Sequence, residues 1–334
     1  MSPTPRKRRR RSLRRMPVQT AMLFLLGVLA PLLAAEHGQV DTVEVQTSAA
    51  WERTFNGYFA SLAASSEPNE VALSLQLPFG NEPSPSEIEN RIDRWERHQP
   101  NAEAVRLLAA LSCSAYSEHN ESALQRMCTK HKLLPRWQQI DRGNALPWMI
   151  AAQRAQSAGE DADLARALTK VEESDRFDWQ QRVIMRVIHR GLADLPAVTF
   201  ESADHRAVAG QGIVIGIQPI TWGAINAVCP TGKSAPVRPE RAAICLHLSA
   251  LLTAETSEIG DVSYGHVIAT AYSDHPQTAK KRDVWALQFQ RFMDQVETVS
   301  DSASVPAGYA DYIDQVIAEG EVLAMRAWLE AGKD

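Results

Sequence analysis

Apolar residues recur with a helical period over most of the chain beyond residue 50. One series is spaced i, i+4, i+7, i+8 and i+11, which places it on a single helix face; its members are Trp51, Phe55, Tyr58, Phe59 and Leu62. The same period predicts helices over 164–171, 179–191, 240–254, 260–272, 280–299 and 319–331. The pattern therefore predicts an all-α fold of helix pairs joined by short polar connections.

Several of the predicted helices begin at residues that favour helix N-termini. Residues 84–87, Ser-Pro-Ser-Glu, place Ser at the N-cap, Pro at N1 and Glu at N3. Asn101 and Asn144 are suited to cap two further helices, because their side-chain oxygens accept hydrogen bonds from free backbone N–H groups.

Residues 210–224, GQGIVIGIQPITWGA, are the ambiguous stretch. Their β-branched residues and glycines are also typical of a strand or hairpin. The rest of the sequence offers no alternating partner strands, and an isolated pair of strands is marginal. We therefore expect two short helices broken at Pro219.

The first 35 residues are typical of an export segment. Residues 6–15 carry eight positive charges, and residues 21–35 are apolar. An apolar run of this length suits a signal peptide and is shorter than the roughly 20 residues of a spanning helix. Ala35 suits a cleavage site, but Leu33 stands where a small residue is preferred. A cleaved signal and an uncleaved inner-membrane anchor both remain open, and either places residues 36–334 in the periplasm or outside the cell.

The rest of the chain is acidic. The whole chain has a net charge of −5, so without the eight positive charges of residues 6–15 the remainder has −13. Binding to a nucleic acid backbone requires a basic face. We therefore expect no nucleic acid partner, a protein or peptide partner, and membrane contact only through the N-terminal segment if it is uncleaved.

The four cysteines form two closely spaced pairs. Cys113 and Cys128 are 15 residues apart, and Cys229 and Cys245 are 16 apart. An even number of cysteines in an exported chain favours disulfides, and we expect the local pairing because each pair can join neighbouring helices. Free buried thiols are one alternative. A metal site is another, but its spacing differs from the usual zinc pattern; its ligands would be Cys113, His119, Cys128 and His131.

Residues 227–234, AVCPTGKS, match the consensus of a nucleotide phosphate loop. In that reading Gly232, Lys233 and Ser234 would contact the phosphates. A phosphate loop needs a strand before it and a helix beginning at its Lys-Ser pair. Pro236 and Pro239 disfavour a helix there. We therefore interpret the stretch as a turn closed by the Cys229–Cys245 disulfide. For the protein as a whole, we expect no metal or other cofactor.

Residues 144–168 resemble one helix pair of the tetratricopeptide family. Trp148 lies near the start of the first helix, small residues follow it, and the turn 159–161, Gly-Glu-Asp, leads into the second helix. With the export segment and the two cysteine pairs, the chain is similar to exported helical proteins of proteobacteria that have no assigned activity. The resemblance implies an all-α fold and supplies no catalytic residues.

We expect the helix pairs to stack as an α-solenoid after the export segment, residues 1–35. A natural division separates an N-terminal region, 36–191, from a C-terminal region, 192–334, and the two regions are expected to be continuous. The eight tryptophans are interpreted as core residues or, alternatively, as the lining of a peptide- or glycan-binding surface.

Common catalytic motifs are absent from the sequence, which contains no H-E-x-x-H, G-x-S-x-G or C-x-x-C. The function predicted is therefore that of an exported helical-repeat protein that binds a protein or peptide, or that is structural in the envelope. Binding is favoured over catalysis, and an enzymatic activity stays open. Two alternatives remain. One is an envelope hydrolase whose carboxylates the sequence does not pair, and the other is a nucleotide-binding protein that uses residues 227–234.

Overall fold

The computed structural model describes residues 56–75, 84–114, 123–195, 200, 202–217, 221–232, 236–255, 257–300 and 307–332. The expected export segment, together with Trp51 and Phe55, lies outside these ranges. Every described residue belongs to one compact unit, 48–334. The division proposed at 191/192 stays a prediction.

All regular elements of the described residues are helical, as the sequence predicts. Residues 56–64 are helical. The elements that follow are α4 (Pro68–Ser74), α5 (Pro85–Arg97), α6 (Ala102–Cys113), α7 (Ala123–Lys130), α8 (Leu133–Ile140), α9 (Ala145–Ala158), α10 (Asp161–Glu172), α11 (Gln181–Ala193), α12 (Ala203–Ile217), α13 (Trp222–Val228), the 3-10 turn η2 (Pro239–Arg241), α14 (Ala242–Leu252), α15 (Ile259–Tyr272), α16 (Pro276–Ser300), α17 (Tyr309–Glu319) and α18 (Glu321–Ala331).

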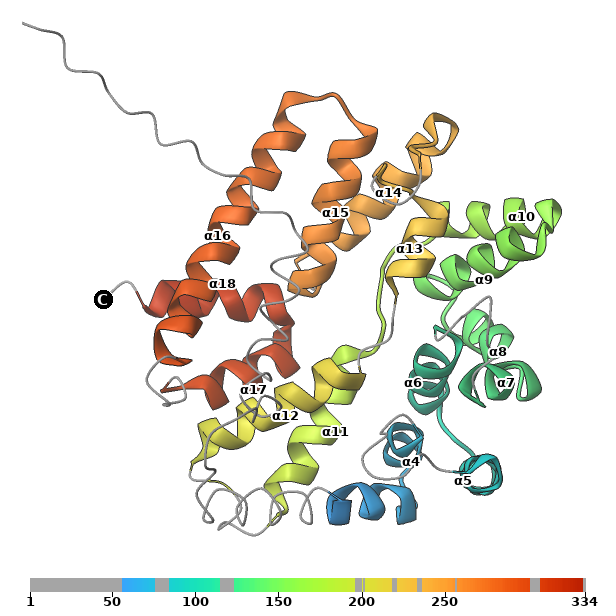
Figure 1. Ribbon diagram of the computed structural model, residues 1–334, viewed down its shortest axis with the longest axis vertical. Helices are drawn as coiled ribbons and strands as arrows, with labels where there is room; N and C mark the ends of the chain where they lie inside the picture. The colour runs from blue at the N-terminus through green and yellow to red at the C-terminus, as the bar shows by residue number, and fades with distance from the viewer. Residues whose placement is uncertain are drawn as a thin grey trace, which may run out of the picture. The chain divides into compact units, whose positions relative to one another are not determined.

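Consecutive helices pack in pairs, and some distant helices pack as well (Figure 1). The consecutive pairs are α9–α10, α11–α12, α14–α15, α15–α16 and α17–α18. Helix α13 packs against α9, and α17 packs against both α11 and α12. Within the described residues, no helix is both long and apolar enough to cross a membrane.

The predicted helix starts are confirmed. Ser84 and Glu87 form a reciprocal capping box at α5, in which the Glu87 amide donates to the Ser84 hydroxyl and the Ser84 amide donates to the Glu87 carboxylate. Asn101 caps α6. Asn144 caps α9 through the Leu146 amide at 3.1 Å. Local sequence chemistry therefore sets these helix boundaries.

The described residues of the stretch 210–224 adopt the helical alternative. Helix α12 ends at Ile217 and α13 begins at Trp222. Pro219, where the break between the two helices was expected, lies outside the described residues. Gly210 allows close packing here, because a Cβ atom on it would lie 2.5 Å from the His189 ring of α11.

The C-terminal prediction was incomplete. The expected helix 319–331 begins at Glu321, and an additional helix, α17, precedes it. The two are separated at Gly320, whose φ of 107° lies in a region that side-chain-bearing residues rarely adopt. Helix α16 is also longer than predicted, beginning at Pro276.

The described tryptophans contribute to the core. Trp95, Trp137 and Trp179 are among the largest fully buried side chains, and Trp285 is also buried. The partly buried ones pack against the same core; they are Trp148, Trp222 and Trp328. This agrees with the interpretation of these seven residues as packing residues.

Candidate functional site

The stretch 227–234 does not have the order of elements that a phosphate loop requires. Ala227 and Val228 end a helix, α13, where a strand would be needed. Gly232 has a positive φ of 81°. Lys233 and Ser234 lie outside the described residues. The next regular backbone among the described residues is the 3-10 turn at Pro239, and α14 begins at Ala242. No helix N-terminus of the described residues therefore begins at the Lys-Ser pair.

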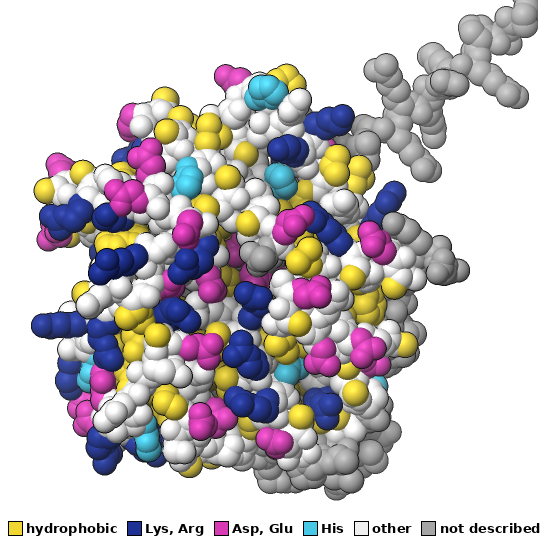
Figure 2. All heavy atoms as spheres, turned by 180° about the vertical axis from the view of Figure 1, so that it is seen from behind, with side chains coloured by type: hydrophobic (Ala, Val, Ile, Leu, Met, Phe, Trp, Pro, Cys, Tyr) yellow, Lys and Arg dark blue, Asp and Glu magenta, His cyan; other side chains and the backbone are white. Residues whose placement is uncertain are grey.

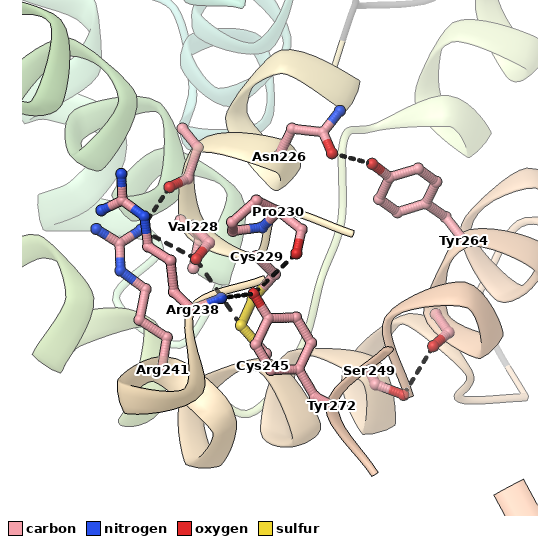
Figure 3. The surroundings of a disulfide bond; sticks show 12 residues. Asn226, Val228, Cys229, Pro230, Arg238, Arg241, Cys245, Ser249, Tyr264 and Tyr272 are labelled. Atoms are coloured by element: carbon pink, nitrogen blue, oxygen red, sulfur yellow. Dashed lines mark hydrogen bonds between the residues drawn. A yellow bond between two sulfur atoms is a disulfide. The ribbon is translucent and has the colours of Figure 1, made fainter. Parts of the chain in front are cut away.

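The Cys229–Cys245 disulfide joins the end of α13 to α14 (Figure 3), with a Cα–Cα distance of 5.5 Å. Both cysteines are fully buried. Tyr272 of α15 holds the residues that follow, since its hydroxyl donates to the Pro230 carbonyl at 2.9 Å and accepts from the Arg238 amide at 3.3 Å. The structure therefore uses this stretch as a cross-linked connection between helices.

Arg241 is a buried cation beside this disulfide (Figure 3). Its guanidinium donates to the carbonyls of Ala227 at 2.5 Å and Val228 at 3.0 Å, which are free acceptors at the end of α13. Burial lowers the pKa of Arg241. The partial negative charge of the helix C-terminus compensates for part of the desolvation. Arg241 thus acts as a cap for α13.

The Cys113–Cys128 disulfide joins α6 to α7, with a Cα–Cα distance of 5.3 Å. Arg154 of α9 donates to the Cys113 carbonyl at 3.1 Å and to the Cys128 sulfur at 3.3 Å. Both predicted pairings are therefore present. Oxidised cysteines supply no thiolate ligands, and no group of three or more metal-ligating side chains occurs within the described residues. His119 of the alternative zinc set lies outside them.

Three carboxylic acids that the sequence did not connect gather where α15 and α18 begin. We call Glu258, Asp261 and Glu321 the acid cluster. Glu258 precedes α15, Asp261 lies in its first turn, and Glu321 is the first residue of α18. Glu258 is only 9% exposed and Asp261 only 3%. The Ile259 amide donates to Glu321 Oε2 at 2.8 Å.

Burial makes these carboxyl groups hard to ionise. It raises the pKa of Asp261 to about 8, and the neighbouring Glu321 adds to the effect. The pKa values of Glu258 and Glu321 are also raised, with burial as the largest cause. Displaced carboxyl pKa values are one mark of acid–base sites. The burial of Glu258 and Asp261, however, leaves them little direct access to a polymer substrate.

Helix α16 presents a second apolar surface in addition to its packed face. Trp285 and Phe292 are buried on the packed side. On the outer side, Val284 is 48% exposed and Leu287 is 67% exposed. Exposed cations lie at either end, and the spacing of Lys280, Val284, Leu287 and Arg291 places these four residues on one helix face. We call these four residues the outer stripe of α16.

The surface charge elsewhere is mixed. On the face shown in Figure 2, Lys and Arg side chains are interspersed with Asp and Glu side chains. The described residues of that face therefore present no continuous basic surface of the kind that a nucleic acid backbone requires.

Comparison with known proteins identifies no relative. No protein-family model, curated protein or solved structure matches the chain. The resemblance to exported proteobacterial helical proteins therefore stays a prediction, and the candidate sites rest on their own geometry.

Proposed function

We propose that the protein is exported and works outside the cytoplasm, with residues 1–35 as its signal or anchor. Two buried disulfides support this, since disulfides persist in oxidising compartments and are rare in the cytosol. The basic and apolar N-terminal sequence supports it independently.

We also propose that the helix pairs form a solenoid-like, tetratricopeptide-related array. The packing of α9 on α10, and of α10 on α14, supports this, because each pair then contacts a neighbour. The contact of α17 with α11 is an additional feature that a simple array lacks. Arrays of this kind bind peptides along extended surfaces.

Within this fold, the function we propose is binding of a protein segment on the outer stripe of α16. The observation that carries it is the pair of exposed apolar residues, Val284 and Leu287, on a helix whose other face is already packed. A helix that is apolar on two sides usually buries both.

Charge indicates what kind of segment would bind. Lys280, Lys281 and Arg291 are exposed, and no carboxylate of the described residues forms an ion pair with them. The nearby Asp283 is already paired with Arg282 at 2.9 Å. A complementary partner is therefore an amphipathic helix with an apolar centre and carboxylates at its ends.

The test is photo-crosslinking of the full chain in exporting cells. A photoreactive amino acid at position 287 is expected to capture one protein, and mass spectrometry should map the adduct to an acidic amphipathic segment. Position 311 on α17, also exposed, is the matched control site. Adduct yield should fall at least tenfold in the double variant Lys280→Glu/Arg291→Glu. It should be unchanged in Ile140→Asp, which alters an exposed apolar residue on α8.

Three outcomes would overturn the proposal. They are no protein adduct at position 287, an equal adduct from position 311, and an adduct to lipid alone. The last would identify the outer stripe as a membrane-contact surface.

The two alternative functions have less support. A hydrolase would need its carboxyls open to substrate, whereas Glu258 and Asp261 are buried. A nucleotide-binding role for 227–234 would need a strand before the loop, whereas α13 stands there.

A further inference from the structure

The acid cluster lies at a junction between elements that are distant in sequence. Glu258 and Asp261 belong to the start of α15, and Glu321 begins α18. The hydrogen bond from the Ile259 amide to Glu321 Oε2 joins the two helix starts across 62 residues. Helix α18 packs on α17, so the junction helps to hold the α17–α18 pair in place.

The side chains that face the acid cluster are acidic or neutral. Tyr309 and Tyr312 of α17 face Glu321. Asp178 and Trp179, from the connection between α10 and α11, face Asp261. Cations of the surrounding described elements face other groups: Arg106 and Arg182 act on Asp178, Arg326 pairs with Glu255 at 2.9 Å, and Lys281 and Arg282 act on His266.

One carboxyl oxygen in the cluster also lacks a partner. Oε2 of Glu258 has no hydrogen-bond partner among the described residues, although the residue is 91% buried. A buried carboxylate with neither a cation nor a full set of donors is strongly disfavoured, whereas a protonated carboxyl group is tolerated. The folded arrangement therefore binds protons at this junction.

We propose that the acid cluster is a pH-sensitive latch between α15 and the α17–α18 pair. The latch is closed when the carboxyls are protonated, and it is released as they ionise. Release frees the start of α18 from α15, while the far end of the pair stays attached, because Asp204 of α12 accepts the amides of Gly308 and Ala310 at 3.3 and 2.8 Å. The latch does not depend on partner binding at α16.

The direction of the response follows from linkage. In the closed state the pKa of Asp261 is about 8, whereas a solvated Asp has a pKa of 3.8. The closed state therefore holds a proton that the open state gives up, and closure weakens as pH rises toward 8. Between these two pKa values, each pH unit changes the opening equilibrium about tenfold for the release of one proton.

The test is hydrogen–deuterium exchange of the full chain, followed in peptides that cover residues 309–331. Between pH 6.5 and 8, the opening equilibrium of these peptides should rise about fifteenfold after correction for intrinsic exchange rates, because the dependence flattens as pH approaches the closed-state pKa of Asp261. This window lies at or above the ordinary histidine pKa, so histidines contribute little to the slope. Asp261→Asn and Glu258→Gln should each keep the α17–α18 pair protected from exchange at pH 8. Each should also flatten the dependence of the opening equilibrium on pH.

Asp311→Asn is the matched control, because Asp311 is an exposed acid on α17. It should retain the wild-type slope. Protection that does not depend on pH in the wild-type protein would overturn the latch, and this result needs no variant to fold. An Asp261→Asn slope equal to that of the wild type would overturn it as well.

Discussion

Replacing both Cys229 and Cys245 by alanine is expected to lower the free energy of unfolding by about 3 kcal/mol. The bridge closes a segment with a sequence separation of 16 residues. In the chain-entropy description, a loop of about 15 residues restricts the unfolded chain by roughly 3 kcal/mol. The Cys113–Cys128 bridge has a separation of 15 residues. The entropic terms of the two bridges should therefore agree to within about 0.1 kcal/mol.

Urea unfolding monitored by far-ultraviolet circular dichroism measures the effect. With a slope of about 3 kcal/mol per molar urea, the midpoint should fall by about 1 M. Reduction of the wild-type protein should lower the free energy of unfolding by the sum of the two bridges' contributions. Each double alanine variant should lower it by the contribution of the bridge that it removes. Alanine is preferred to serine as the replacement, because both sulfurs are buried and a hydroxyl there would need a partner.

An unchanged midpoint in the Cys229/Cys245 variant would refute the structural role of this bridge. A free Cys229 thiol, detected by alkylation and peptide mapping of protein taken from exporting cells, would refute the bridge itself. A larger loss for this pair than for Cys113/Cys128 would show that α13, a helix of only seven residues, depends on the bridge for more than chain entropy.

Two further predictions concern buried polar groups. Asn144→Ala should destabilise the protein by about 2–4 kcal/mol in the same urea assay, because Asn144 caps α9 and also donates to the Asp178 carbonyl at 2.7 Å. Burial lowers the pKa of His189 to about 4 from 6.5. The free energy of unfolding should therefore fall by up to about 3 kcal/mol as pH drops from 6.5 to 4, because His189 takes up its proton at a higher pH in the unfolded chain than in the folded protein. His189→Gln should flatten this acid slope, and an unchanged slope would contradict the assignment.

The helices were predictable where local chemistry and periodicity agree. Ser84, Asn101 and Asn144 mark helix starts by side-chain capping alone, which needs no tertiary information. Residues 210–224 required a second argument, the lack of partner strands, because their β-branched composition by itself favours a strand. The disulfide pairing was predictable because each pair is close in sequence.

Helix α17 was not predicted, although its sequence contains apolar residues at a helical period. Tyr309, Tyr312, Ile313 and Val316 recur at i, i+3, i+4 and i+7, and the last three are buried. Helices α4, α7 and α8 have only seven or eight residues, about two turns, which is too short for a period to stand out.

The acid cluster was beyond the reach of sequence reasoning. Asp and Glu in the first turn of a helix are ordinary, because they interact favourably with its dipole. Asp261 and Glu321 are both such residues and would each be interpreted as solvent-facing. Only the approach of the two helix starts in the folded chain, joined by the hydrogen bond from the Ile259 amide to Glu321, brings these acids together in one buried junction.

The positions of the disulfides determine what kind of response the latch can give. All four cysteines of the chain are used in the α6–α7 and α13–α14 bridges, so no covalent link restrains the α17–α18 pair. Ionisation of the acid cluster therefore acts on a part of the fold that can open while the bridged helices stay folded. His189 responds in the opposite direction, since acid destabilises its site between α11 and α12. Because α17 packs on both of these helices, acid weakens the surface to which the pair is attached, and alkaline pH weakens its latch to α15. We therefore expect the α17–α18 pair to be held most tightly at mildly acidic pH, and to be released as pH rises toward 8.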